Sequence, residues 1–101
     1  MKDTKSEIKV GEEATLNELL VGSVGSITHI RGEGKLRRRL FDMGLTPGVE
    51  VFLRKKAPLG DPLEVTLRGY ELTLRKDEAA NVVLKVTDLS MVNKTGEKES
   101  K

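Results

Sequence analysis

Few side chains in this 101-residue chain could carry out a reaction or hold a metal ion. The sequence contains no cysteine, which excludes disulfides, thiol catalysis and zinc–cysteine sites. His29 is the single histidine, and no carboxylate at a regular spacing accompanies it to form a nucleophile triad. No glycine-rich loop ends in Gly-Lys-Ser/Thr, the pattern that cradles nucleotide phosphates. Together these exclusions predict a protein that is not an enzyme.

His29 leaves two interpretations open. It shares strand parity with Ile27, which predicts a partly buried structural histidine. As a metal ligand it would need carboxylates from elsewhere in the fold, such as Glu33 or Asp42, or from a second molecule. We therefore expect no resident cofactor and leave a weak divalent-metal site open.

The densest run of positive charge is Arg37-Arg38-Arg39, inside a segment whose apolar spacing predicts a helix over residues 35–43. At 100° per residue, Arg37, Arg38 and Phe41 project away from the apolar face, while Arg39 flanks it. This face is either a solvated basic surface or a docking surface for an acidic patch or a phosphate. Phe41 and Phe52 both fall off the core-facing parity, and two such aromatic residues beside arginines have the composition of an interface hot spot. The alternative is that the helix folds over the strand and buries the two aromatic rings together.

Short strands separated by sharp turns must position these residues. Alternating apolar and polar residues predict five strands. The predicted strands lie at residues 24–30, 49–53, 63–67, 72–74 and 82–86, and short helical turns are predicted near residues 15–20 and 76–80. The first of these turns starts with Thr15 and Glu18 in the spacing of a capping box. The pattern predicts a mainly β fold, a small SH3-like antiparallel β-barrel with one or two short helices.

One hairpin can be predicted in register. If Gly69 and Tyr70 are the two central residues of a type II′ turn, Leu67 faces Leu72 and paired positions sum to 139. Val65 then faces a second leucine on the core side, and opposite charges pair on the other side.

The predicted domain covers residues 15–87, between flexible tails at residues 1–14 and 88–101 that lack hydrophobic periodicity. All seven arginines lie inside the predicted domain, although the whole chain carries a formal net charge of only +2. No apolar run approaches the ~18–20 residues that cross a bilayer, and no hydrophobic signal core follows Met1. These features, with the absence of cysteine, predict a cytoplasmic protein.

Several motifs occur in the order found in one family. They are Leu16-x-x-Leu19 followed by Gly22, Met43-Gly44-Leu45-Thr46-Pro47-Gly48, Ala57-Pro58-Leu59-Gly60-Asp61-Pro62, and Leu74-Arg75-Lys76. Through these motifs the sequence resembles the ferrous iron transport protein A (FeoA) family across essentially the whole predicted domain.

The resemblance implies an SH3-like barrel that serves as a non-enzymatic accessory factor for ferrous iron uptake. Its expected partner is the FeoB permease and that permease's cytosolic GTPase domain, so the chain would reach the membrane only through its partner. The resemblance supplies no catalytic or metal-ligand residues. The docking face that we predict consists of Arg37, Arg38, Phe41, Leu59, Gly60 and Asp61.

Two rival functions stay open at this stage. A metal-sensing SH3-like domain would bind a divalent transition metal, and a small basic barrel would bind nucleic acid through the arginine cluster. Only three aromatic residues are present, which disfavours both base stacking and the aromatic-lined grooves that read polyproline. We therefore expect no nucleic-acid partner, and the oligomeric state is not predicted.

Overall fold

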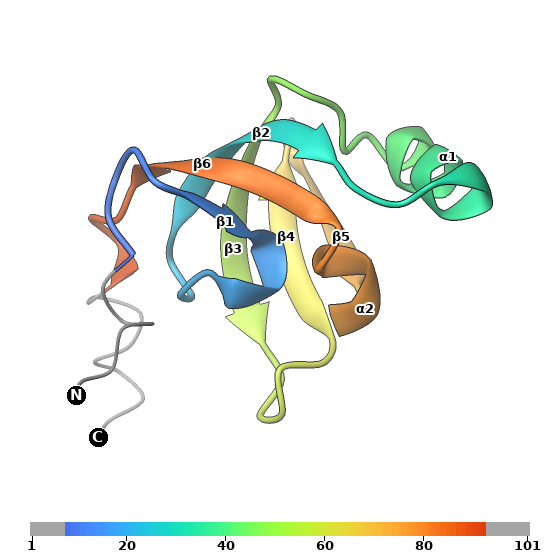
Figure 1. The fold of residues 1–101 in the computed structure, drawn as a ribbon. Helices are drawn as coiled ribbons and strands as arrows, with labels where there is room; N and C mark the ends of the chain where they lie inside the picture. The colour runs from blue at the N-terminus through green and yellow to red at the C-terminus, as the bar shows by residue number, and fades with distance from the viewer. Residues whose placement is uncertain (1–7, 93–101) are drawn as a thin grey trace.

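Alternating leucine and β-branched residues form a bent β-sheet that carries two helices and one 3-10 turn (Figure 1). The computed structural model describes residues 8–92. The elements in chain order are β1 (Glu13–Thr15), η2 (Leu16–Glu18), β2 (Val24–Ile30), α1 (Gly34–Asp42), β3 (Glu50–Lys56), β4 (Leu63–Leu67), β5 (Tyr70–Leu74), α2 (Lys76–Ala79) and β6 (Val82–Asp88). Within residues 8–92, neither helix has the length and apolar character needed to cross a bilayer.

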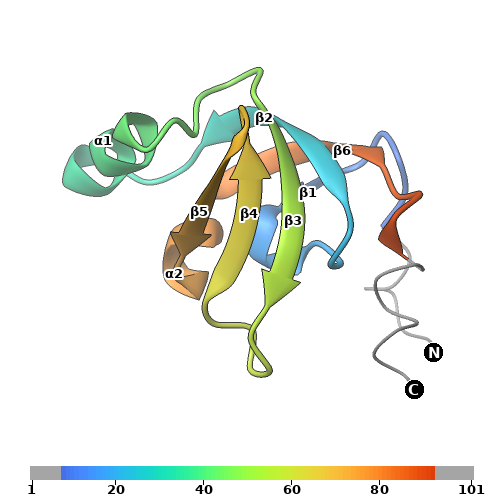
Figure 2. The same ribbon diagram turned by 180° about the vertical axis from the view of Figure 1, so that it is seen from behind.

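The six strands form one antiparallel sheet in the order β1-β6-β2-β3-β4-β5. Figure 2 shows the sheet from behind, with β5 along one margin. Register shifts interrupt the β2–β6 and β3–β4 pairs, and such bulges increase the local bend of a sheet. The prediction of a mainly β, antiparallel fold is confirmed.

The core follows the predicted strand faces. One face of β4 is fully buried, as are Val51 and Leu53 of β3, and Leu40 is the buried residue of α1. Leu16 and Leu19 fill the core from η2 and the segment behind it. The capping interaction predicted for η2 is present, because the Glu18 carboxylate accepts the Thr15 amide at 3.4 Å.

The expected N-terminal tail is too long. Glu13 and Ala14 belong to β1, which pairs with β6, and Ile8 packs against the core. Leu89 also packs against the core, beyond the predicted end of the domain. The rest of the predicted tails 1–14 and 88–101, at residues 1–7 and 93–101, lies outside the described residues. The sequence pattern missed β1 because only three residues form it and their hydrophobicity does not alternate.

The predicted register of the β4–β5 hairpin is wrong, because the turn lies one residue earlier than predicted. The central residues are Arg68 and Gly69, with φ values of 49° and 84°, and Leu67 pairs with Tyr70. Positive φ at both central residues is the type I′ geometry, whose twist matches that of the flanking strands. Leu72 therefore faces Val65. The core faces are unchanged, because the paired positions move by two residues and preserve parity.

Candidate docking surfaces

α1 carries its positive charges on a face turned away from the core. Leu40 is buried beneath the helix, whereas the side chains of Lys35, Arg37 and Arg38 are exposed. Figures 1 and 2 both show α1 standing out from one end of the barrel, joined to it by two extended connections. A protruding helix of this kind presents its charges to a partner without the barrel in the way.

Arg37 and Phe41 are in direct contact on this helix. The guanidinium carbon lies 4.9 Å from the ring centroid, a cation–π arrangement that contributes about 0.5–1 kcal/mol at exposed sites. With Gly34, Arg38 and Asp42 they line a shallow open recess of ≈ 380 Å³, which we call the basic recess. The structure therefore brings the predicted trio of Arg37, Arg38 and Phe41 together. Phe41 is half-buried and also packs against the core.

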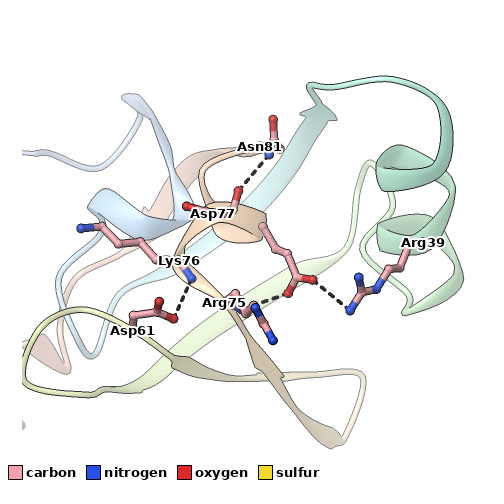
Figure 3. A network of polar contacts seen from close by, with 7 residues as sticks. Arg39, Asp61, Arg75, Lys76, Asp77 and Asn81 are labelled. Atoms are coloured by element: carbon pink, nitrogen blue, oxygen red, sulfur yellow. Dashed lines mark hydrogen bonds and ion pairs between the residues drawn. The ribbon is translucent and has the colours of Figure 1, made fainter.

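α1 is held to the barrel by two polar contacts. The Arg39 guanidinium pairs with the Glu78 carboxylate of α2 at 3.0 Å, and Glu78 also accepts the Arg75 amide at 3.0 Å (Figure 3). Directly after the helix, the Tyr70 hydroxyl of β5 donates to the carbonyl of the C-cap residue Met43 at 2.5 Å. The Glu78 residue is only 7% exposed, so its buried negative charge is stabilised by these donors. Sequence reasoning missed the role of Glu78, because its partner Arg39 lies 39 positions away. The only local signal is that Glu78 falls within a predicted short helical turn.

The second half of the predicted docking face lies in the β3–β4 loop. Leu59 is 87% exposed at this loop, which makes it the most exposed large apolar side chain among the described residues. Asp61 is already engaged, because its Oδ1 accepts the Lys76 amide at the start of α2 at 3.0 Å (Figure 3). Its carboxylate therefore supports the fold as well as facing solvent.

The two halves do not form one face. Figures 1 and 2 place α1 and the β3–β4 loop at different ends of the barrel. The reason is that α1 leads into the start of β3, whereas the loop follows the end of β3. Seven residues at ~3.3 Å each separate these points by about 20 Å. The predicted site of Arg37, Arg38, Phe41, Leu59, Gly60 and Asp61 is thus two separate surfaces.

His29 is exposed, and the expectation of a partly buried structural histidine is wrong. A register shift between Ile27 and His29 in the β2–β6 pair breaks the alternation that would have turned the ring inward. Its Nδ1 lies 3.3 Å from the Thr28 hydroxyl. Within the described part of the chain, no group of three or more histidine, aspartate or glutamate side chains is placed to hold a metal ion.

A bent antiparallel sheet of short strands with a protruding basic helix defines a class of protein, the small SH3-like barrels. The comparison with known families gives the particular one. The family model of the FeoA domain matches residues 14–86, and the chain belongs to this family, whose members take part in ferrous iron transport.

Solved structures support the same assignment. A FeoA-like protein from Clostridium acetobutylicum is 41% identical, with a TM-score of 0.69 over 74% of this chain and 87% of that one. Stenotrophomonas maltophilia FeoA, solved with zinc and described as an SH3 domain protein, is 31% identical, with a TM-score of 0.62 over 70% of this chain and 88% of that one.

A curated relative links the domain to a transporter. A fusion protein of Fe(2+) transport protein A with the Fe(2+) transporter FeoB, from Porphyromonas gingivalis, is 33% identical over 67 residues. The match covers 66% of this chain and 8% of the fusion protein.

Proposed function

We propose that this chain is a non-enzymatic accessory protein that docks on the cytosolic GTPase domain of an FeoB-like permease and regulates or assembles it. The fusion of a similar domain with FeoB in one polypeptide supports this pairing, since fused domains share a location and a task. The chain would then be cytoplasmic and would reach the membrane through its partner alone.

The observation that carries the proposal is the basic recess on α1. Its cations are exposed, and the Arg39–Glu78 pair fixes the helix from which they project. Arginine and an aromatic side chain in contact are the residue types enriched at interface hot spots. Because the recess is positive, its partner would be an acidic patch of the GTPase domain. Charge would set the encounter rate and the specificity of such a contact more than its final affinity.

The β3–β4 loop would provide a secondary contact. Leu59 offers an apolar tip, and Gly60 beside it shapes the loop, with its amide donating to the Ala57 carbonyl at 2.7 Å. The loop lies at the other end of the barrel, so it would bind a different part of the permease from α1. We propose that both contacts form without a resident metal and that nucleic acid is not a partner.

Titration of the purified GTPase domain with this chain, with and without a GTP analogue, tests the proposal. The Arg37→Glu, Arg38→Glu double variant should bind the GTPase domain at least tenfold more weakly. For the unaltered protein, the association rate should fall as the salt concentration is raised. The matched control is Lys55→Glu, Lys85→Glu, which makes the same change in charge at exposed positions of β3 and β6. Thermal melts should confirm that both variants remain folded.

The remaining arms separate the rival functions. Equal loss in both double variants would show a general charge effect and refute a docking site on α1. Binding that appears only with added Fe²⁺ or Zn²⁺, and disappears with chelator, would favour metal sensing. Tight, steeply salt-dependent binding to random-sequence RNA would favour the nucleic-acid barrel. GTP hydrolysis rates measured in the same mixtures would distinguish regulation from assembly.

A further inference from the structure

The β5 strand forms a free edge of the sheet with unpaired main-chain groups. It pairs with β4 on one side, and the sheet order ends with it. Figure 2 shows β5 at the margin of the sheet, with α1 beyond one end and α2 at the other. Exposed edges are ready templates for an added strand, and native proteins usually protect them.

The β4–β5 register shows which main-chain N–H and C=O groups of β5 point away from β4. Leu67 and Tyr70 flank the two-residue turn, so they form a hydrogen-bonded pair, and Leu72 shares the parity of Tyr70. The N–H and C=O groups of Glu71 and Thr73 therefore point away from β4. Among residues 8–92, neither amide donates to a main-chain or side-chain acceptor.

Three of the usual protections, proline, lysine and a bulge, are missing along this stretch. β5 contains no proline or lysine, and its register with β4 has no bulge. The opposite edge, β1, is only three residues long. The next outward amide along the chain, that of Arg75, is already capped by the Glu78 carboxylate at 3.0 Å. The open part of the edge is thus confined to Glu71 and Thr73.

The surroundings of this edge select the chemistry of its occupant. Arg68 and Arg75 are exposed at its two ends, and Arg39, whose side chain is 63% exposed, lies against Glu78 beyond Arg75. The one acid of β5 itself, Glu71, is engaged by Arg54 at 3.5 Å. Leu72 is half-buried on the core side of the edge and offers an apolar contact. An occupant that alternates apolar and acidic side chains would satisfy both features.

We propose that the β5 edge binds an extended segment of another protein, in which apolar and acidic residues alternate, by adding it as a seventh strand. Main-chain bonds to Glu71 and Thr73 would supply affinity, and the flanking arginines would supply specificity. This surface is separate from the basic recess, and the inference does not depend on the identity of the partner proposed above.

A defined probe tests the inference. Uniformly ¹⁵N-labelled protein is titrated with an acetylated, amidated heptapeptide of alternating glutamate and valine. The amide signals of Glu71 and Thr73 should shift most, and their hydrogen exchange should slow. The Thr73→Pro variant lacks one outward donor and should bind about tenfold more weakly. It should still fold, because proline is tolerated on the solvent side of an edge strand. Thr73→Ala keeps the donor and should bind like the original protein.

A second measurement guards against a folding failure of the proline variant. The same peptide, N-methylated at its central residues, should not bind the unaltered protein. The inference is overturned if Glu71 and Thr73 do not shift, if Thr73→Pro binds normally, or if a lysine–valine peptide binds equally well. It is also overturned if both signals shift on concentrating the protein alone, because a second copy would then occupy the edge.

Discussion

Replacing Gly44 by alanine should loosen α1 from the barrel. Gly44 follows the helix with φ = +98°, in the left-handed region that side chains other than glycine rarely adopt. A Cβ at this position would lie 2.5 Å from the Tyr70 hydroxyl oxygen. That hydroxyl donates to the Met43 carbonyl, so an alanine must displace the group that ties the end of α1 to β5.

The cost can be worked out from two contributions. The left-handed backbone costs about 1–2 kcal/mol for a residue with a side chain. Displacing the Tyr70 hydroxyl loses one hydrogen bond, worth about 0.5–1.5 kcal/mol. The free energy of unfolding should therefore fall by about 1.5–3.5 kcal/mol, which lowers Tm by roughly 6–28 °C in a domain of this size.

A double-mutant cycle with Tyr70→Phe separates the two contributions. Phenylalanine removes the hydroxyl that clashes, so Gly44→Ala should cost only the backbone contribution in that background. Chemical denaturation of the four proteins should give a coupling of about 1 kcal/mol. Strictly additive effects would refute the steric argument. A Gly44→Ala protein of unchanged stability would refute the backbone argument as well.

Three further predictions concern polar contacts. Glu78→Gln keeps the cap but loses the ion pair with the largely exposed Arg39, so the free energy of unfolding should fall by no more than ~1 kcal/mol. Glu78→Ala removes both contacts and should lower the free energy of unfolding by about 1–2 kcal/mol in denaturant melts; equal losses in the two variants would contradict this division. Asp61→Ala removes the acceptor at the start of α2 and should lose about 0.5–2 kcal/mol, while Asp61→Asn should stay near the original value; equal losses in the two would show that the acceptor contributes nothing. The Ser90 amide donates to Asp88 and lowers the pKa of that carboxyl below 3.8, so its stabilising contribution is complete above pH 3.8 and is lost as the pH falls through the lower folded pKa; an NMR titration of Asp88 at or above its ordinary pKa would contradict this.

Local patterns were enough to predict most of the elements. The apolar spacing of α1 and the glycine behind it gave its bounds within one residue at each end. The alternation in β3 and β4 identified their buried faces correctly. Even the hairpin error left these faces intact, because Arg68 in place of Tyr70 at the turn shifts the pairing by two positions. The gathering of Arg37, Arg38 and Phe41 was predictable because helical geometry alone brings them together.

The chain's order of apolar, polar and turn-forming residues determined its strands, its helices and the exposed positive charge on one of them. Only the tertiary structure decided which distant groups meet. It pairs Glu78 with Arg39, places the Asp61 carboxylate at the start of α2, and separates the β3–β4 loop from the basic recess. It also added β1 and left β5 with an open edge. The physical reason is that periodicity reports the orientation of each side chain within its own element, whereas sheet order and bulges set the contacts between elements.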